Sequence, residues 1–158
     1  GYPVSAVVTS SEVIDAFRQH SHYFNTFAGT PVACAAASAV LDVIEEQGLQ
    51  ARALETGRYF KDSLKELAAF HPLIGDIRGS GMFIGIELVK DRASREPAVS
   101  ETEKAVNLLR ENGVLIGSTG QFDNVLKIRP PMVFTRQNAD LLLDKLSATL
   151  TAVRMESG

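Results

Sequence analysis

The sequence predicts an α/β fold in which helices cover a short sheet, and two observations support this prediction. Residues 82–89 are almost continuously apolar and rich in β-branched side chains, a pattern typical of a strand buried on both faces. Near the end of the chain, Leu142, Leu146 and Leu150 recur at the spacing of one helix face. The 158 residues are 45% hydrophobic, which is enough for a substantial core between a central strand and such helices.

The first elements are predicted from an apolar run and a capping pattern. Residues 4–8 are apolar apart from one serine and indicate a short strand. Thr9 is followed three residues later by Glu12, which is the pattern of a capping box, so a helix is expected from there to about residue 19. The chain is therefore expected to open with a strand and a helix.

Two long helices are predicted next. Thr30 is a favourable N-cap and Pro31 suits the first helical position, so a helix is expected over residues 31–47. Its first half is mostly alanine, which favours close packing against other backbone and predicts a buried, inert thiol at Cys34. A second helix is expected over residues 50–70, where apolar side chains recur on one face.

Strands and helices alternate in the second half of the chain. After the central strand, Ser100 and Glu103 form another capping-box pattern, which predicts a further helix. Short strands are expected at residues 114–116 and 124–128. Thr135 is expected to cap the last helix, which carries the leucine face described above.

Composition excludes several function classes. The formal net charge is −3 and the Lys and Arg residues are scattered, so no nucleic acid is expected as a partner. His22 has no cysteine or carboxylate at metal-ligand spacing, and no metal site is predicted. Neither a membrane-spanning segment nor a signal-like stretch occurs, so no membrane contact is expected and the protein is predicted to be cytoplasmic. The absence of an initiator methionine indicates the middle of a longer protein.

A candidate anion site lies in the turn before the helix at residues 31–47. Thr26 stands between Asn25 and Phe27, where its hydroxyl and nearby backbone N–H groups could together hold a phosphate. A threonine in a turn also commonly satisfies local backbone groups instead. The residues alone leave both interpretations open.

Three cationic residues are further candidates. Arg78 precedes a glycine-rich stretch, residues 79–81, where its planar guanidinium could hold a carboxylate or phosphate or brace a turn. Lys127 and Arg129 alternate with apolar residues, so both are expected on one face of the strand at residues 124–128. One or both could bind an anion, and a solvated strand face is the alternative.

Four motifs stand in a specific order and spacing that covers nearly the whole chain: Gly1-Tyr2-Pro3, Asn-Thr-Phe-Ala-Gly-Thr-Pro at residues 25–31, Ile-Arg-Gly-Ser-Gly-Met-Phe-Ile-Gly-Ile-Glu-Leu at residues 77–88, and Pro130-Pro131-Met132. With them the sequence resembles the C-terminal part of a class III pyridoxal-phosphate-dependent aminotransferase of fold type I. Residues 23–27 and 124–128 are most similar to the alanine-glyoxylate aminotransferase 2-like branch. That branch includes phospholyases that act on phosphorylated amino alcohols and hydroxylysine.

This resemblance implies a domain division and partners. Residues 31–158 would be the C-terminal small domain, including the long linking helices, and residues 1–30 a remnant of the large cofactor-binding domain with its phosphate-contact turn. The implied cofactor is pyridoxal 5'-phosphate, and the implied assembly is a homodimer with a shared active site and a small-molecule amine substrate.

The resemblance also implies roles for single residues. Thr26, together with Asn25, would contact the cofactor phosphate of the neighbouring subunit. Lys127 matches the place where many members carry an arginine that grips the substrate α-carboxylate, and Arg78 is the second substrate-binding candidate. A lysine lacks the bidentate fork of arginine, which leaves room for a phosphorylated amine. The lysine that forms the Schiff base is expected just before Gly1, so the resemblance implies no catalytic residue in this chain.

Three functions remain as hypotheses. In the first, the chain is part of an aminotransferase that moves an amino group between an amine or amino acid and an oxo acid. The second keeps the cofactor but eliminates phosphate from a phosphorylated amino alcohol or hydroxylysine. In the third, the chain as it stands is a catalytically silent dimerisation module, inactive alone because it lacks the lysine.

Overall fold

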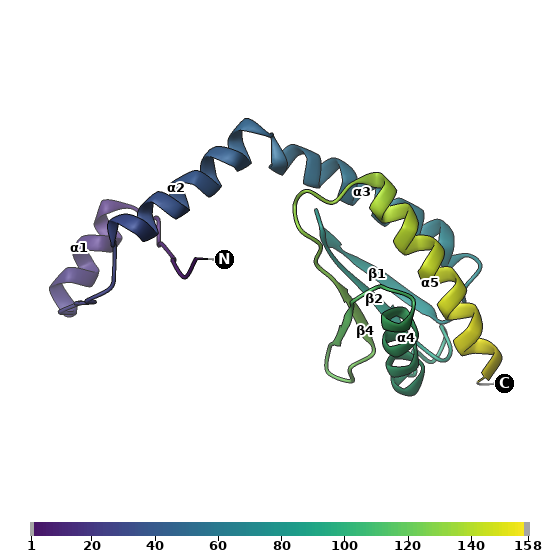
Figure 1. Ribbon diagram of the computed structural model, residues 1–158. Helices are drawn as coiled ribbons and strands as arrows, with labels where there is room; N and C mark the ends of the chain where they lie inside the picture. The colour runs from purple at the N-terminus through teal and green to yellow at the C-terminus, as the bar shows by residue number, and fades with distance from the viewer. Residues whose placement is uncertain (1, 157–158) are drawn as a thin grey trace. The chain divides into compact units, whose positions relative to one another are not determined.

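The computed structural model describes residues 2–156, so Gly1, the first residue of the first motif, lies outside the described residues. The chain forms two compact units, Gly1–Gly48 and Leu49–Gly158, which are described separately (Figure 1). This division falls inside the predicted small domain, and the predicted domain boundary at residue 30 stays a prediction.

Residues 2–48 of the first unit form two helices, α1 (Ser11–His20) and α2 (Pro31–Glu46). The strand predicted at residues 4–8 is wrong: no strand forms among the described residues of this unit, and Val7 and Val8 are 90% and 96% exposed. A strand needs a partner strand for its backbone groups, and a short apolar run supplies none by itself.

Helix capping in this unit follows the prediction only at α2. No side chain caps α1, whose N-cap is Ser10, so the capping box predicted at Thr9 is wrong. At α2 the Thr30 hydroxyl accepts a hydrogen bond from the Ala33 N–H at 3.4 Å, which confirms the predicted N-cap. Cys34 is exposed within the unit, against the expected burial.

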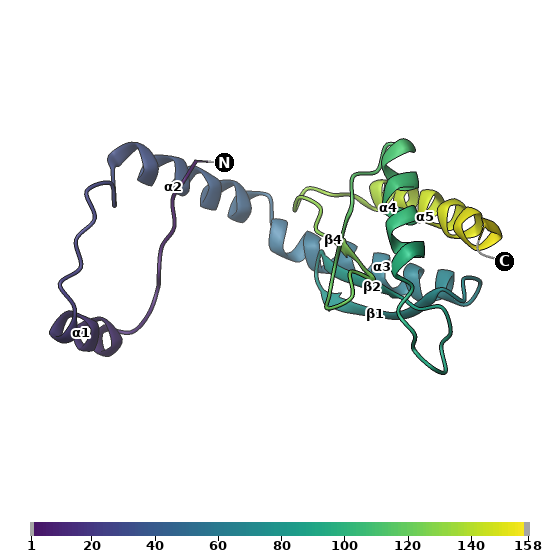
Figure 2. The ribbon, with the colours of Figure 1, turned by 90° about the horizontal axis from the view of Figure 1, so that it is seen from below.

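Over residues 49–156 the second unit contains three helices and a four-stranded antiparallel sheet in the order β1-β2-β4-β3. Figure 2 labels β1, β2 and β4 of this sheet. Its elements are α3 (Leu49–Ala68), β1 (Ile74–Ser80), β2 (Phe83–Leu88), α4 (Val99–Glu111), β3 (Gly117–Thr119), β4 (Val125–Ile128) and α5 (Arg136–Glu156). The strand predicted at residues 82–89 is β2, and it lies between β1 and β4, as expected for a central strand.

The strands differ from the prediction in two places. β1 was not expected as a strand; it pairs with β2 across a tight turn in which Gly81 adopts a φ of 52°. The strand expected at residues 114–116 lies three residues later, as β3, because only residues 117–119 pair with β4. In both cases hydrogen bonding to a neighbouring strand determines which residues form the strand, and the composition of the segment does not reveal that pairing.

The two faces of β2 differ in burial. Ile84, Ile86 and Leu88 are at most 1% exposed and join a core with residues of α3, α4 and α5, while the intervening Gly85 and Glu87 are only partly buried. The prediction of a strand buried on both faces is therefore wrong for β2. The predicted leucine face of the last helix is confirmed, since the three leucines named for it are buried in α5.

Of the two helix caps predicted in this unit, one is wrong and one is confirmed. The Ser100 capping box is wrong, because α4 starts at Val99 and no side chain caps it. At α5, Thr135 Oγ1 accepts from the Asn138 N–H at 3.3 Å, and Asn138 Oδ1 accepts from the Thr135 N–H at 3.1 Å. This reciprocal pair confirms the cap predicted at Thr135.

Candidate functional site

The turn before α2 is organised by Asn25. Its side-chain Oδ1 accepts a hydrogen bond from the Phe27 N–H at 3.0 Å, and its carbonyl accepts from the Ala28 N–H at 3.3 Å. Such an Asx turn holds the backbone of the next residues in place. Gly29 then adopts a φ of 67°, the left-handed region that favours glycine, and leads the chain into the helix.

This geometry leaves the Thr26 side chain available. Thr26 is exposed, and among residues 2–156 its hydroxyl forms no hydrogen bond. The alternative interpretation, in which this threonine satisfies the local backbone, is therefore not what the structure contains: Asn25 does so instead. A free hydroxyl in an ordered turn just ahead of a helix N-terminus is suited to a phosphate group.

The two substrate-binding candidates lie in one row of the sheet. Arg78 of β1 pairs with Gly85 of β2, Gly85 pairs with Lys127 of β4, and Lys127 pairs with Gly117 of β3. Directly opposite residues in an antiparallel sheet point to the same face. The tertiary structure thus brings Arg78 and Lys127 onto the face opposite the apolar core, one strand apart.

Arg78 is held by carboxylates of the same face. Its Nη1 donates to Asp76 at 2.8 Å and to Glu87 at 2.5 Å, and these two hydrogen bonds raise the pKa of the guanidinium above its ordinary value. All three side chains are a third or more exposed, so the network adds little stability. It ties β1 to β2, which is the bracing role left open for this arginine; its role in substrate binding stays a prediction.

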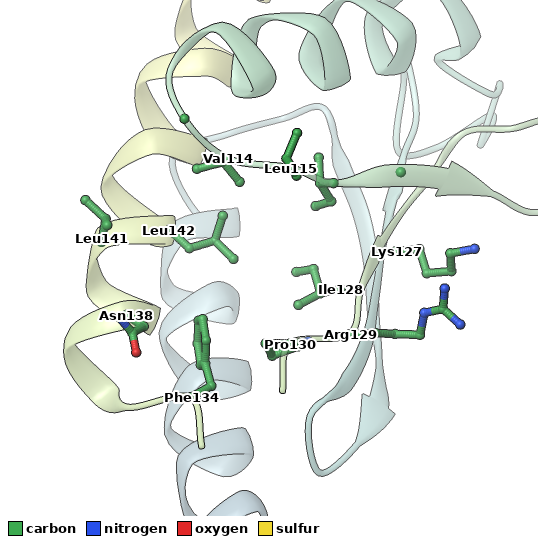
Figure 3. Close-up of a pocket in the computed structure, with 13 residues that line it drawn as sticks. Val114, Leu115, Lys127, Ile128, Arg129, Pro130, Phe134, Asn138, Leu141 and Leu142 are labelled. Atoms are coloured by element: carbon green, nitrogen blue, oxygen red, sulfur yellow. The ribbon is translucent and has the colours of Figure 1, made fainter. Parts of the chain in front are cut away.

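Lys127 and Arg129 extend from β4 in one direction. Figure 3 shows both side chains pointing away from Val114, Phe134 and Leu142, which lie on the other side of the strand. Among residues 2–156 neither cation forms an ion pair. This confirms the predicted common face and leaves both charges available to an anion.

A cavity of about 610 Å³ opens beside this strand end (Figure 3). Apolar side chains from the segment before β3, from β4 and from the start of α5 line it, and Lys127 and Arg129 are also among its lining residues. The lining includes Val114, Ile116, Ile128, Phe134, Leu141 and Leu142. The cavity is a mainly apolar space that borders the two cations Lys127 and Arg129.

The glycines of the Lys127 row were missed by sequence reasoning. Gly85 and Gly117 are 32 positions apart in the sequence, and only strand register shows that both stand opposite Lys127. A glycine inside the apolar run of β2 was the available signal, because glycine within a strand often marks a close approach.

Metal and membrane features were also searched. No cluster of three or more His, Cys, Asp or Glu side chains that could hold a metal ion occurs in the part of the chain that the structure describes. Over the same residues, no helix is both long and apolar enough to span a membrane. The cytoplasmic location stays a prediction.

Comparisons with known proteins agree with this fold. The family model for class III aminotransferases matches residues 1–150. A Drosophila melanogaster protein named alanine–glyoxylate aminotransferase 2-like is 47% identical over 99% of this chain, which covers 32% of that protein.

Two solved structures are similar as well. A phospholyase from Arthrobacter in complex with phosphoethanolamine superposes with a TM-score of 0.86 and 43% identity, over 90% of this chain and 34% of that one. An amine transaminase from an uncultivated Pseudomonas species, in its pyridoxal-phosphate-bound form, superposes with a TM-score of 0.79 and 30% sequence identity. The superposition covers 90% of this chain and 34% of that one. The chain thus spans about a third of the length of these relatives.

Proposed function

The chain belongs to the class III aminotransferase family of fold type I, and on that premise we propose that the protein containing it is a pyridoxal-phosphate-dependent aminotransferase. It would move an amino group between an amine or amino acid and an oxo acid. The observation that supports this most directly is the ordered turn of Asn25 with its free Thr26 hydroxyl. Lys127, which forms no ion pair among the described residues, adds a cation that could hold a second acidic group.

The reaction requires that two acidic groups be held, the phosphate of the cofactor and the acidic group of the substrate, and residues of this chain suit both. Thr26 would donate to the cofactor phosphate, while Asn25 keeps the turn in the conformation that presents the hydroxyl. Lys127 would hold the acidic group of the substrate, which fixes the direction from which the amine approaches. When bound, pyridoxal phosphate supplies an electron sink for the charge that develops as the substrate loses a proton.

The remaining parts of the site would come from outside this chain. We place the reactive lysine ahead of Gly1 and the cofactor phosphate that meets Thr26 in the second subunit of a homodimer. Support comes from the large apolar side chains that the first unit exposes, among them Phe24 at 86% and Phe27 at 83%. Such exposure is typical of a surface that another part of the assembly covers. Alone, the chain would be catalytically silent.

A phospholyase is the second candidate function. One feature favours it: the resemblance described above implies an arginine at the position of Lys127 in many family members, and a compact ammonium suits a phosphate as well as a carboxylate. The Arthrobacter relative is described as a phospholyase in complex with phosphoethanolamine. The two candidates share the cofactor and differ in the bond that breaks after proton loss.

The full-length protein distinguishes these functions. We expect oxo acid to form when it is given amino donors with glyoxylate or pyruvate, whereas release of inorganic phosphate from phosphoethanolamine would favour the phospholyase. Turnover of neither kind would overturn both proposals. The isolated 158-residue chain should show no turnover and no borohydride-reducible cofactor adduct. A stable adduct together with turnover would contradict the proposal that the chain alone is catalytically silent.

Thr26 is tested by cofactor binding itself. Thr26→Val in the full-length protein should weaken pyridoxal phosphate about tenfold, because a phosphate hydrogen bond is lost. Thr9→Val is the matched control, since Thr9 is also exposed in the first unit. Equal cofactor affinity in both variants would remove Thr26 from the phosphate site.

A further inference from the structure

We propose that the cavity between the end of α3 and the last turns of α5 binds an organic monocarboxylate, a small molecule with an apolar body and a single carboxylate group. Arg154 and His71 hold the carboxylate in this proposal, while Phe70 and Met155 cover the apolar body. The proposed function uses none of these residues, and the inference does not depend on it.

The cavity combines apolar and polar side chains. Its volume is about 430 Å³, and it is lined by Phe70, His71, Thr151, Arg154 and Met155. Small-molecule sites commonly measure about 300–1,000 Å³ and join apolar side chains with a few polar groups. Phe70 and Met155 are 78% and 81% exposed, so their ring and thioether are free to pack on the apolar body of a ligand.

His71 has one ring nitrogen available to a ligand. The residue is only 8% exposed, and its Nε2 lies 3.0 Å from Ser147 Oγ. Among residues 2–156, its Nδ1 forms no hydrogen bond. Over the same residues no fully buried side-chain nitrogen or oxygen lacks a partner, so Nδ1 is accessible from outside. With the Ser147 hydroxyl donating to Nε2, the ring proton is on Nδ1, which can donate it to a carboxylate oxygen.

The charge at the cavity matches a single carboxylate. Arg154 forms no ion pair among residues 2–156, and Glu156 of the same helix end lies 3.5 Å from Lys104 instead. Burial and then the positive charge of Arg154 lower the pKa of His71, so its imidazole is neutral at pH 7. The lining therefore carries one positive charge, and the planar guanidinium of Arg154 suits the two oxygens of a carboxylate.

The backbone at the end of α3 is partly neutralised by Arg92. Carbonyl groups at the C-terminus of a helix carry partial negative charge, which disfavours an anion. Arg92 Nε donates to the Ile74 carbonyl at 3.0 Å. Its Nη2 donates to the carbonyl groups of Ala68 and His71. These hydrogen bonds weaken the repulsion that the backbone around His71 would otherwise exert on a bound carboxylate.

The test follows the Met155 methyl group by carbon-13 NMR in the full-length protein loaded with cofactor, and Met155→Leu assigns its signal. Benzoate is the probe, and benzyl alcohol is its uncharged counterpart. Benzoate should shift the Met155 signal saturably. Benzyl alcohol should bind about fivefold more weakly, because it lacks the charge that Arg154 attracts at a partly exposed site. Absence of a saturable shift with benzoate, or equal affinity for the two compounds, would overturn the proposal.

Arg154→Gln tests the charged part of the site. This change should weaken benzoate about fivefold and leave benzyl alcohol unchanged. Arg110→Gln is the matched control, because Arg110 is also an exposed arginine in the last turn of a helix, α4. Equal benzoate affinity in the two variants would overturn the role of Arg154. A Met155 shift that is lost in Lys127→Gln but kept in Arg154→Gln would place benzoate at Lys127 and overturn the site.

Phe70→Ala tests whether the cavity recognises the apolar body or only the charge. Because Phe70 is 78% exposed, its loss should leave the unfolding midpoint unchanged, yet it should weaken benzoate about threefold. Phe122→Ala is the control, since Phe122 is 53% exposed and does not line the cavity. Equal benzoate affinity in these two variants would mean that a bare charge attracts the anion, and it would overturn the proposed binding site.

Discussion

The two units of the chain treat their apolar side chains in opposite ways. The second unit buries Phe60, Ile86 and Leu126 completely in a core shared by its sheet and helices. In the first unit Ala33 is the only buried hydrophobic side chain among the described residues, and Val8 is 96% exposed. Burial of apolar surface is the main driving force of folding. The second unit therefore contains the source of its own stability, while the first unit needs a surface from elsewhere.

The largest expected effect comes from removing a core side chain. Phe60 is fully buried and its ring lies 6.3 Å from that of Phe134, so Phe60→Ala should lower the free energy of unfolding by about 3–5 kcal/mol. Phe24 is 86% exposed, and Phe24→Ala should change it by less than about 0.5 kcal/mol. Urea denaturation of the chain compares the two. Similar losses would show that the first unit has a core of its own in solution.

The next largest difference between the units is expected from replacing a glycine by alanine where the fold leaves no space for the added Cβ and where it does. A Cβ at Gly57 would overlap the carbonyl oxygen of Gly81, so Gly57→Ala forces α3 away from the β1–β2 turn and should cost about 2 kcal/mol. A Cβ added at Gly29 in the first unit would meet no atom within 4 Å. Gly29→Ala should therefore lower the free energy of unfolding by only about 1 kcal/mol, because alanine disfavours the positive φ of this position. The readout is the thermal midpoint. A Gly57 variant as stable as the wild type would mean that α3 can shift without loss.

Equivalent helix caps offer a smaller test. Thr135→Ala and Thr30→Ala each remove a hydroxyl that accepts from a helix N–H, a loss of about 1 kcal/mol. We expect the Thr135 change to lower the urea midpoint of the second unit, because α5 packs on its core. The Thr30 change should appear only as faster amide exchange at the start of α2. An equal shift of the urea midpoint in both variants would show that the two units unfold together, against this prediction.

The smallest expected effect is a pH dependence specific to the second unit. Burial, and to a lesser extent the positive charge of Arg154, hold the pKa of the His71 imidazole below its ordinary value of 6.5. The unfolded chain then takes up the proton first as pH falls, so this stability is present above pH 6.5 and is lost below it.

This prediction is checked by urea unfolding between pH 7.5 and 5.5. His71→Gln should flatten the slope, whereas His22→Gln, which changes an exposed histidine of the first unit, should leave it in place. A slope that survives in the His71 variant would assign the pH dependence to other groups. Because His71 accepts from or donates to Ser147 Oγ at 3.0 Å, glutamine keeps a partner for that hydroxyl.

How much the sequence predicts differs between these regions. Helices α2, α3 and α5 lie where periodicity and caps place them, because those signals are local. The strand at residues 4–8 and the capping boxes at Thr9 and Ser100 fail, since a short apolar run or a polar pair forms an element only if a neighbour supports it. The family motifs, by contrast, were specific enough to identify the family, which the comparisons confirm.

The candidate site divides in the same way. Thr26 and Lys127 could be selected from sequence, because a turn before a helix and an alternating strand are local patterns. The engagement of Arg78 by Asp76 and Glu87, and the glycines opposite Lys127, depend on residues from different strands. No spacing along the chain reveals them.

The amino-acid sequence by itself determined the helices, the central strand, the family and the residue types able to hold a phosphate. Only the tertiary structure decided which face of β2 is buried, which cation is already paired and which remains available. The physical reason is that helix caps and side-chain periodicity act within a few residues, whereas sheet register and ion pairing join residues that are distant in sequence.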